Sequence, residues 1–188
     1  MPLPLSVSRE EVHCRRIEMR GYRRADGMYD IEGRLIDTKP QPFALDGIPV
    51  IVAPGAHHHD MWVRIVVDDD FVVREVHAAS DATPYPACHD APDTLQALVG
   101  ARIARGWSAT VKERLGGARS CTHLMEMMLP LATAAWQSMI AVRRARPEAL
   151  DADGRPLKID SCYAYASDRE LVRIRWPAHY TGASTKSS

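Results

Sequence analysis

The feature that most constrains the fold is a change of hydrophobic period near residue 79. Before it, segments rich in valine and isoleucine alternate with polar residues, as half-buried strands do. After it, apolar residues recur every three or four positions, as on one face of a helix. The chain then returns to short alternating segments. Strands, then helices, then strands predict an α+β fold.

The expected strands pair as antiparallel hairpins, packed with one long helix in the C-terminal half and two shorter helices. The clearest hairpin joins 61–68 to 71–79 through an acidic turn. The other expected elements are strands at 12–19, 29–37 and 48–53, short helices at 90–100 and 107–115, a long helix from about 121 to 146, and a last hairpin of 158–166 with 170–177.

The length of 188 residues suits a single domain, 1–188, that can bury a sizeable core. Within it we expect N-terminal strands in 12–55, a central metal-site unit in 56–147 and a C-terminal hairpin in 156–177. Lys plus Arg and Asp plus Glu both number 24, so no net field draws nucleic acid or an anionic membrane. The start resembles no signal peptide and no apolar run could span a membrane, so we expect a cytoplasmic protein.

Three separated segments concentrate residues that bind metals: HHHDMW at 57–62, PYPACHD at 84–90 and SCTHLMEMM at 120–128. Thiolate, imidazole and carboxylate groups together favour zinc or iron over magnesium or calcium. HHHD is expected in a loop before a strand, and both cysteines beside helix starts, so the three segments can converge in one α+β unit. The sequence therefore predicts a zinc site, with iron or an iron–sulfur cluster as the alternative, held by His58 or His59, Asp60, Cys88 and Cys121.

Catalytic roles are assigned to Cys121 and His123. On a regular helix His123 faces away from Cys121, so it reaches the same site only if Cys121 is at or before the cap; its expected role is proton transfer. The basic stretch at 15–24 is either a solvated strand face or an anion pocket, in which Arg20, Arg23 or Arg24 would hold a carboxylate or phosphate.

The predicted function is a metal-dependent enzyme with hydrolase- or lyase-type chemistry on a small anionic metabolite. Two alternatives remain open: an iron–sulfur or metal carrier, and a non-catalytic module with a structural zinc. The expected partner is a small-molecule substrate, with no nucleic acid and no membrane, and a homo-oligomer is allowed.

Five motifs resemble a bacterial family known as domain of unknown function 2889, a resemblance that covers nearly all of 12–177. They are RGYRRADGMYDIEGRLIDTK at 20–39, HDMWVRIVVD at 59–68, PYPAC at 84–88, LVGARIARGW at 98–107 and CTHLMEMM at 121–128. The family name implies no activity.

Residues 57–142 more distantly resemble the iron–sulfur scaffold proteins of the IscU/NifU type, which implies an IscU-like central unit with strands added at both ends. In this resemblance His58 stands for the first scaffold cysteine and Asp60 for the aspartate, while Cys88 and Cys121 match the second and third cysteines. One thiolate is missing, which favours a mononuclear zinc over a cluster.

Overall fold

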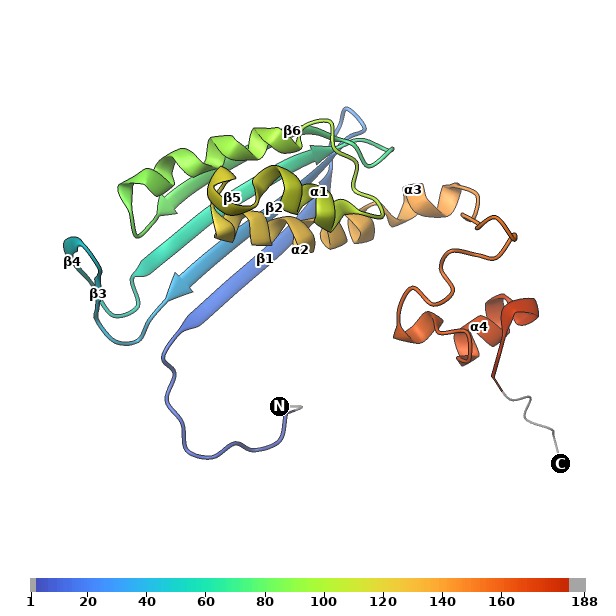
Figure 1. Ribbon diagram of the computed structural model, residues 1–188, viewed down its shortest axis with the longest axis horizontal. Coiled ribbons are helices and arrows are strands. Elements are labelled where there is room, and N and C mark those ends of the chain that lie inside the picture. The colour runs from blue at the N-terminus through green and yellow to red at the C-terminus, as the bar shows by residue number, and fades with distance from the viewer. Residues whose placement is uncertain (1–2, 183–188) are drawn as a thin grey trace. The chain divides into compact units, whose positions relative to one another are not determined.

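The computed structural model describes residues 3–182, which fall into two compact units (Figure 1). The first unit extends to Ile140 and the second begins at Ala141. Four antiparallel strands form the sheet of the first unit in the order β1-β2-β5-β6. Their bounds are β1 (Cys14–Arg23), β2 (Tyr29–Thr38), β5 (His57–Val67) and β6 (Val73–Ala82). A separate small hairpin of β3 (Phe43–Leu45) and β4 (Ile48–Val52) lies between β2 and β5 in the chain.

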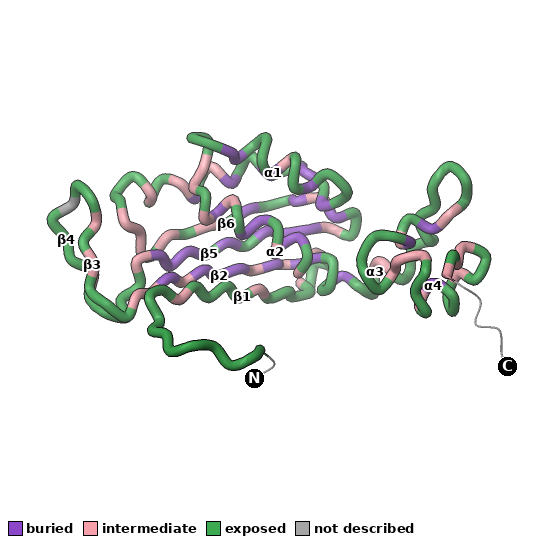
Figure 2. The backbone as a smooth tube through the Cα atoms, turned by 60° about the horizontal axis from the view of Figure 1, so that its bottom comes forward, coloured by how far each residue is buried: buried purple, intermediate pink, exposed green. Residues whose placement is uncertain are grey.

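Helices follow the sheet in the chain and lie over one of its faces, so the expected α+β class is confirmed (Figure 1). They are η1 (Pro86–Leu98), α1 (Trp107–Leu115), η2 (Gly117–Arg119) and α2 (Thr122–Ser138). We call this face the covered face and the opposite one the outer face. Figure 2 shows alternating buried and less buried residues along β2, because successive side chains of a strand point to opposite faces.

The core of the first unit lies between α2 and the covered face of the sheet. Its fully buried residues include Ile31, Leu35, Met61 and Ile65 from the strands and Leu124, Met127, Met128 and Leu131 from α2. Gly33 allows the close approach of α2, since a Cβ at this position would lie 3.0 Å from Met127 and 2.8 Å from Met19. Burial of these side chains holds the start of α2 beside the strand ends that carry the candidate site.

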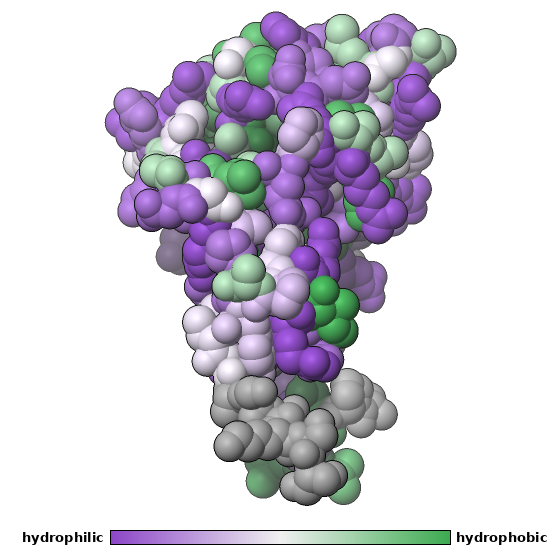
Figure 3. All heavy atoms as spheres, turned by 90° about the vertical axis from the view of Figure 1, so that its right-hand side faces the viewer, coloured by the Kyte–Doolittle hydropathy of each residue, from purple (hydrophilic) through white to green (hydrophobic). Residues whose placement is uncertain are grey.

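The second unit contains η3 (Tyr163–Tyr165), α4 (Glu170–Arg175) and η4 (Pro177–His179), while α3 (Ile140–Ala145) begins at the boundary. The face in Figure 3 is mostly hydrophilic, with hydrophobic residues in small separate groups, as on ordinary protein surfaces.

The expected hairpin of 158–166 and 170–177 is wrong. The alternation of LVRIR spans too few residues to distinguish a strand from a short helix, and an ion pair between Glu170 and Arg173, one turn apart, supports the helix.

Three further expectations need correction. The loop expected at HHHD is wrong, because these residues open β5 and pair with the end of β2. The long helix was expected to reach about 146, but it ends at Ser138. The next residue, Met139, leaves helical geometry at φ −98° and ψ 27°. The helix expected from 90 begins at Pro86 and has the tighter 3₁₀ form.

Other expectations are confirmed. The helix at 107–115 has the expected bounds, the long helix starts directly after Cys121, and the hairpin expected at 61–79 is formed by β5 and β6. Within residues 3–182, none of the helices combines the length and apolar character needed to cross a membrane.

Candidate functional site

A β-bulge distributes the three consecutive histidines of β5 over different positions. Asp37 of β2 pairs with His59 and its neighbour Thr38 pairs with His57, so His58 is the extra residue of the bulge. His59 lies on the covered face beside Asp37, and the shift of one residue places His57 on the outer face, where it contacts Asp60. The histidine run therefore supplies groups to two faces of the sheet.

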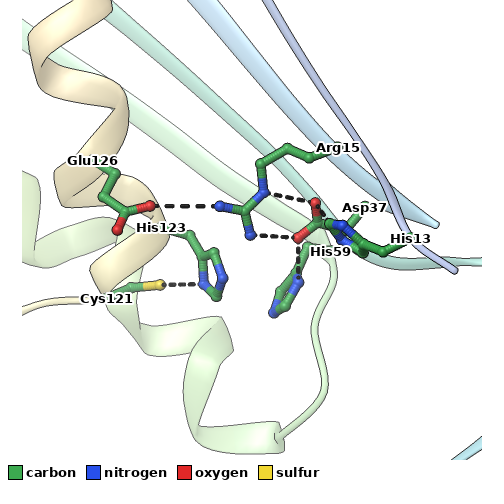
Figure 4. Close-up of polar contacts among 7 residues, drawn as sticks. All are labelled: His13, Arg15, Asp37, His59, Cys121, His123 and Glu126. Carbon is green, nitrogen blue, oxygen red and sulfur yellow. Dashed lines mark hydrogen bonds and ion pairs between the residues drawn. The ribbon is translucent and has the colours of Figure 1, made fainter. Parts of the chain in front are cut away.

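Asp37 is the centre of the candidate site and is fully buried (Figure 4). Arg15 holds it with two hydrogen bonds, from Nε to Oδ1 at 2.7 Å and from Nη2 to Oδ2 at 2.8 Å. His59 Nδ1 lies 2.8 Å from Oδ2, and His13 Nε2 lies 3.3 Å from Oδ1. Burial alone would raise the pKa of Asp37, but hydrogen bonding and charge from Arg15, followed by His59, outweigh it and lower the pKa to about 2. Asp37 is therefore an anion at neutral pH.

The anionic state of Asp37 determines the tautomer of His59. Since the Asp37 carboxylate can only accept, the Nδ1 of His59 must donate. Burial, and then the neighbouring His123, lower the pKa of His59 to about 4. His59 is thus a neutral imidazole whose Nε2 carries a lone pair, which is the form that binds a metal or accepts a proton.

Cys121 and His123 lie beside His59 at the start of α2 (Figure 4). Cys121 is the residue before the first helical turn, so its Sγ lies 3.8 Å from Nδ1 of His123 despite the spacing of two residues. Burial raises the pKa of the Cys121 thiol, but hydrogen bonds from His123 and from the backbone N–H groups of Leu124 and His123 outweigh this effect, and the net shift is downward. The imidazole rings of His59 and His123 lie 4.0 Å apart, tilted by 39°.

These groups border a pocket of about 640 Å³ in the first unit, a volume suited to a small molecule. His59, Cys88, Cys121 and His123 all line it. Arg119, Asp90, Thr94 and Tyr85 are among its other lining residues. The structure therefore places four of the residues singled out in the sequence around one pocket.

Among residues 3–182, two groups of three side chains place one potential ligand atom each within 4.8 Å of the others. One comprises Asp37, His59 and His123, and the other comprises His13, Asp37 and His58. Asp37 belongs to both. Neither group includes a cysteine, although Cys121 contacts His123 of the first group.

Asp60 does not join this site. It lies on the outer face and accepts two hydrogen bonds from Arg34, at 2.8 and 2.7 Å, while His57 Nδ1 lies 2.9 Å away. Hydrogen bonding from Arg34 lowers its pKa. A strand that directs Met61 and His59 to the covered face must direct Asp60 away from it. The structure gives Asp60 the role of an ion-pair partner.

The three arginines expected to bind an anion lie on β1 and the following turn, away from the residues that line the pocket. Arg20 pairs with Glu18, and Arg24 pairs with Asp26 and Asp30. Arg23 is exposed at the end of β1. The basic residue that does line the pocket is Arg119, whose Nη2 donates to the carbonyl of Lys112 at 3.4 Å.

The sequence reasoning missed the partnership of Asp37, Arg15 and His13. A signal was present in YDIEGRLID, where Asp37 occupies the same alternate positions as Tyr29, Ile31 and Leu35. An acid in line with the apolar face of a strand is costly to bury unless it is paired, so it marks a site or an ion pair. Its partners Arg15, on β1, and His13, just before β1, give no comparable signal.

One family model, described as protein of unknown function (DUF2889), matches residues 13–137, which is more than half of the chain. The chain therefore belongs to the DUF2889 family. The match covers every residue of the candidate site and ends close to the boundary of the first unit. No curated protein and no solved structure gives a significant match, and no comparison supports the resemblance to the IscU/NifU scaffolds.

Proposed function

We propose that this member of the DUF2889 family is a metal-dependent enzyme, with zinc held by His59, His123 and Cys121 at the wall of the pocket. The observation that carries the proposal is the contact between Cys121 Sγ and His123 Nδ1 at 3.8 Å, beside the His59 ring, which lies 4.0 Å from that of His123. With zinc–sulfur bonds of about 2.3 Å and zinc–nitrogen bonds of about 2.0–2.1 Å, tetrahedral ligands lie roughly 3.5 Å apart. His59 and His123 offer ligand atoms within 4.8 Å of each other, and Cys121 Sγ adjoins His123.

Asp37 supports this site from behind His59. Asp37 accepts two hydrogen bonds from Arg15 and one from His59. These bonds fix the orientation of the carboxylate, and the carboxylate in turn fixes the orientation of the imidazole. A carboxylate that accepts from the far nitrogen of a metal-binding histidine orients the ring and raises its basicity. Asp37 is therefore proposed as the orienting group, and Arg15, which also pairs with Glu126 at 3.5 Å, as its anchor.

Three protein ligands leave one position open to water, which is the arrangement of catalytic zinc sites. Bound zinc lowers the pKa of water to near neutral and so supplies a nucleophile for hydrolase- or lyase-type chemistry. The substrate is proposed to be a small anionic metabolite in the adjoining pocket. We assign its anion contact to Arg119, because Arg20 and Arg24 are paired with acids on another part of the sheet.

Cobalt substitution with absorption spectroscopy tests the metal site. Co²⁺ should give a thiolate-to-metal charge-transfer band in the wild type, and Cys121→Ser should abolish it. Cys162→Ser is the matched control, because Cys162 is exposed in the second unit and should leave the band unchanged. If the band survives in Cys121→Ser, the metal site lies elsewhere and the proposal is wrong.

A second function is favoured by the same sulfur–nitrogen contact. In the absence of metal, Cys121 at the start of α2 and His123 form a thiol and base pair of the kind used in covalent catalysis. The Cys121 thiolate would attack an electrophilic carbonyl, with His123 holding the proton. Rapid alkylation of Cys121 by iodoacetamide in protein that binds neither zinc nor cobalt would favour this function over the first.

A further inference from the structure

We propose that the cluster of His13, Asp37 and His58 is a second site for a divalent transition metal, separate from the cysteine-containing site. Each residue places a potential ligand atom within 4.8 Å of the other two. They come from three places in the chain: the residue before β1, the end of β2 and the bulge of β5. Two imidazoles and one carboxylate suit zinc, copper, iron or nickel.

The acceptor positions of Asp37 leave room for this ion. A carboxylate offers about four lone-pair positions, two on each oxygen. Arg15 uses one on each oxygen and His59 uses the second on Oδ2. The remaining position is on Oδ1, where His13 Nε2 lies at 3.3 Å, the longest of the four contacts. The fourth position can therefore accept an ion that also binds His13.

His58 supplies the second, independent observation. Its Nδ1 is buried and has no hydrogen-bond partner among the described residues. A buried polar atom without a partner costs about 1–3 kcal/mol, so it points to a ligand. The centre of the His58 ring lies 5.1 Å from that of Phe43 and 5.8 Å from that of His13, so His58 lies between the small hairpin and His13.

The β-bulge explains how the site can exist beside the first one, because it lets consecutive residues of one strand, His58 and His59, approach the same carboxylate from different sides.

Metal stoichiometry tests the inference. Protein dialysed against Zn²⁺ and analysed for metal should contain two zinc ions per chain. His58→Ala and His13→Ala should each contain one, and both should retain the cobalt–thiolate band of the other site. His77→Ala is the control, since His77 is exposed on β6 and pairs with Glu75, and it should retain two.

The outcomes separate the two proposals. One zinc in the wild type that His58→Ala keeps and Cys121→Ser loses would overturn the second site and leave the proposed function standing. One zinc that His58→Ala loses and Cys121→Ser keeps would support the second site and overturn the proposed function. Far-ultraviolet circular dichroism on each variant checks that a lost ion does not reflect a lost fold, and His13, which lies outside the strands, provides the less disruptive variant.

Discussion

Two clusters of the same composition lie on opposite faces of one sheet. The covered cluster consists of Arg15, Asp37 and His59, and the outer cluster consists of Arg34, Asp60 and His57. In both, arginine holds the aspartate through two hydrogen bonds of 2.7–2.8 Å, and a histidine Nδ1 lies 2.8–2.9 Å from the same carboxylate. The contacts within each cluster are nearly identical.

The surroundings of the two histidines differ. The side chain of His59 is 11% exposed and lies beside His123 at the wall of a pocket, whereas that of His57 is 42% exposed. Arg34 of the outer cluster stacks on Trp62, 4.2 Å from the ring centre. Residue types alone therefore do not distinguish the candidate site from a structural ion pair; the features that differ are the burial of the histidine and the position of His123 and Cys121 beside it.

The largest expected difference is in stability after removal of the aspartate. Asp37→Ala should lower the free energy of unfolding by about 3 to 4 kcal/mol, because it leaves the buried His59 without its acceptor and Arg15 without its partner. Asp60→Ala should cost about 1 to 2 kcal/mol, because water can reach His57, whose side chain is 42% exposed. Urea denaturation measures both. Equal losses would show that the two clusters are energetically equivalent.

The next effect is the pH dependence of stability in metal-free protein. The pKa of His59 is about 4 in the folded chain and 6.5 in its ordinary state, so the unfolded chain takes up the proton first as pH falls. The stability is fully present above pH 6.5 and should fall by about 2 to 3 kcal/mol between pH 6.5 and 4. His59→Gln should remove this loss. An unchanged profile in the variant would rule out the buried neutral state of His59.

A smaller effect is expected in metal affinity. Asp37→Asn should weaken cobalt binding at the thiolate site about 10- to 100-fold, because the amide orients His59 less well and does not raise its basicity. Asp60→Asn, with its side chain on the other face, should change the affinity by less than about twofold. Titration of the charge-transfer band against a competing chelator gives both constants. Equal weakening by the two variants would place the outer cluster in the site.

The smallest effect concerns the outer cluster alone. Arg34→Lys should lower the free energy of unfolding by about 1 kcal/mol, since lysine loses both the two-pronged contact with Asp60 and the stacking on Trp62. The fluorescence of the variant should also change, because Trp62 loses its neighbouring guanidinium. Metal binding should stay as in the wild type, and a loss of metal in Arg34→Lys would contradict the separation of the two faces.

Hydrophobic periodicity along the sequence was sufficient to predict the elements whose conformation depends mainly on neighbouring residues. Alternation of valine and isoleucine identified the β5–β6 hairpin, and the helical period identified α1 and the start of α2 at Cys121. The polar run HHHD predicts a loop, but it forms a strand because Asp37 and Arg34, on a strand more than 20 residues earlier, pair with His59 and Asp60. The pairing of β2 with β5 overrides the local preference.

The sequence predicted the types of side chain in the candidate site, but not which residues supply them. His59, Cys88, Cys121 and His123 border one pocket, while the alternation of β5 directs Asp60 to the other face. A register shift of one residue decides which side chain faces the core, and no local pattern encodes it. Asp37 could be noticed from its position on an apolar face, but its partners Arg15 and His13 follow only from the pairing of β1 with β2.

The site residues come from the ends of elements that are far apart in the chain, and this separation has a consequence for folding. Asp37 and His59 are 22 residues apart, and Arg15 is 111 residues from its partner Glu126 on α2. Closing such loops costs entropy that long-range packing must offset, so the cluster can form only once the sheet and α2 have docked. A metal that binds only the assembled cluster would stabilise the folded chain and slow its unfolding.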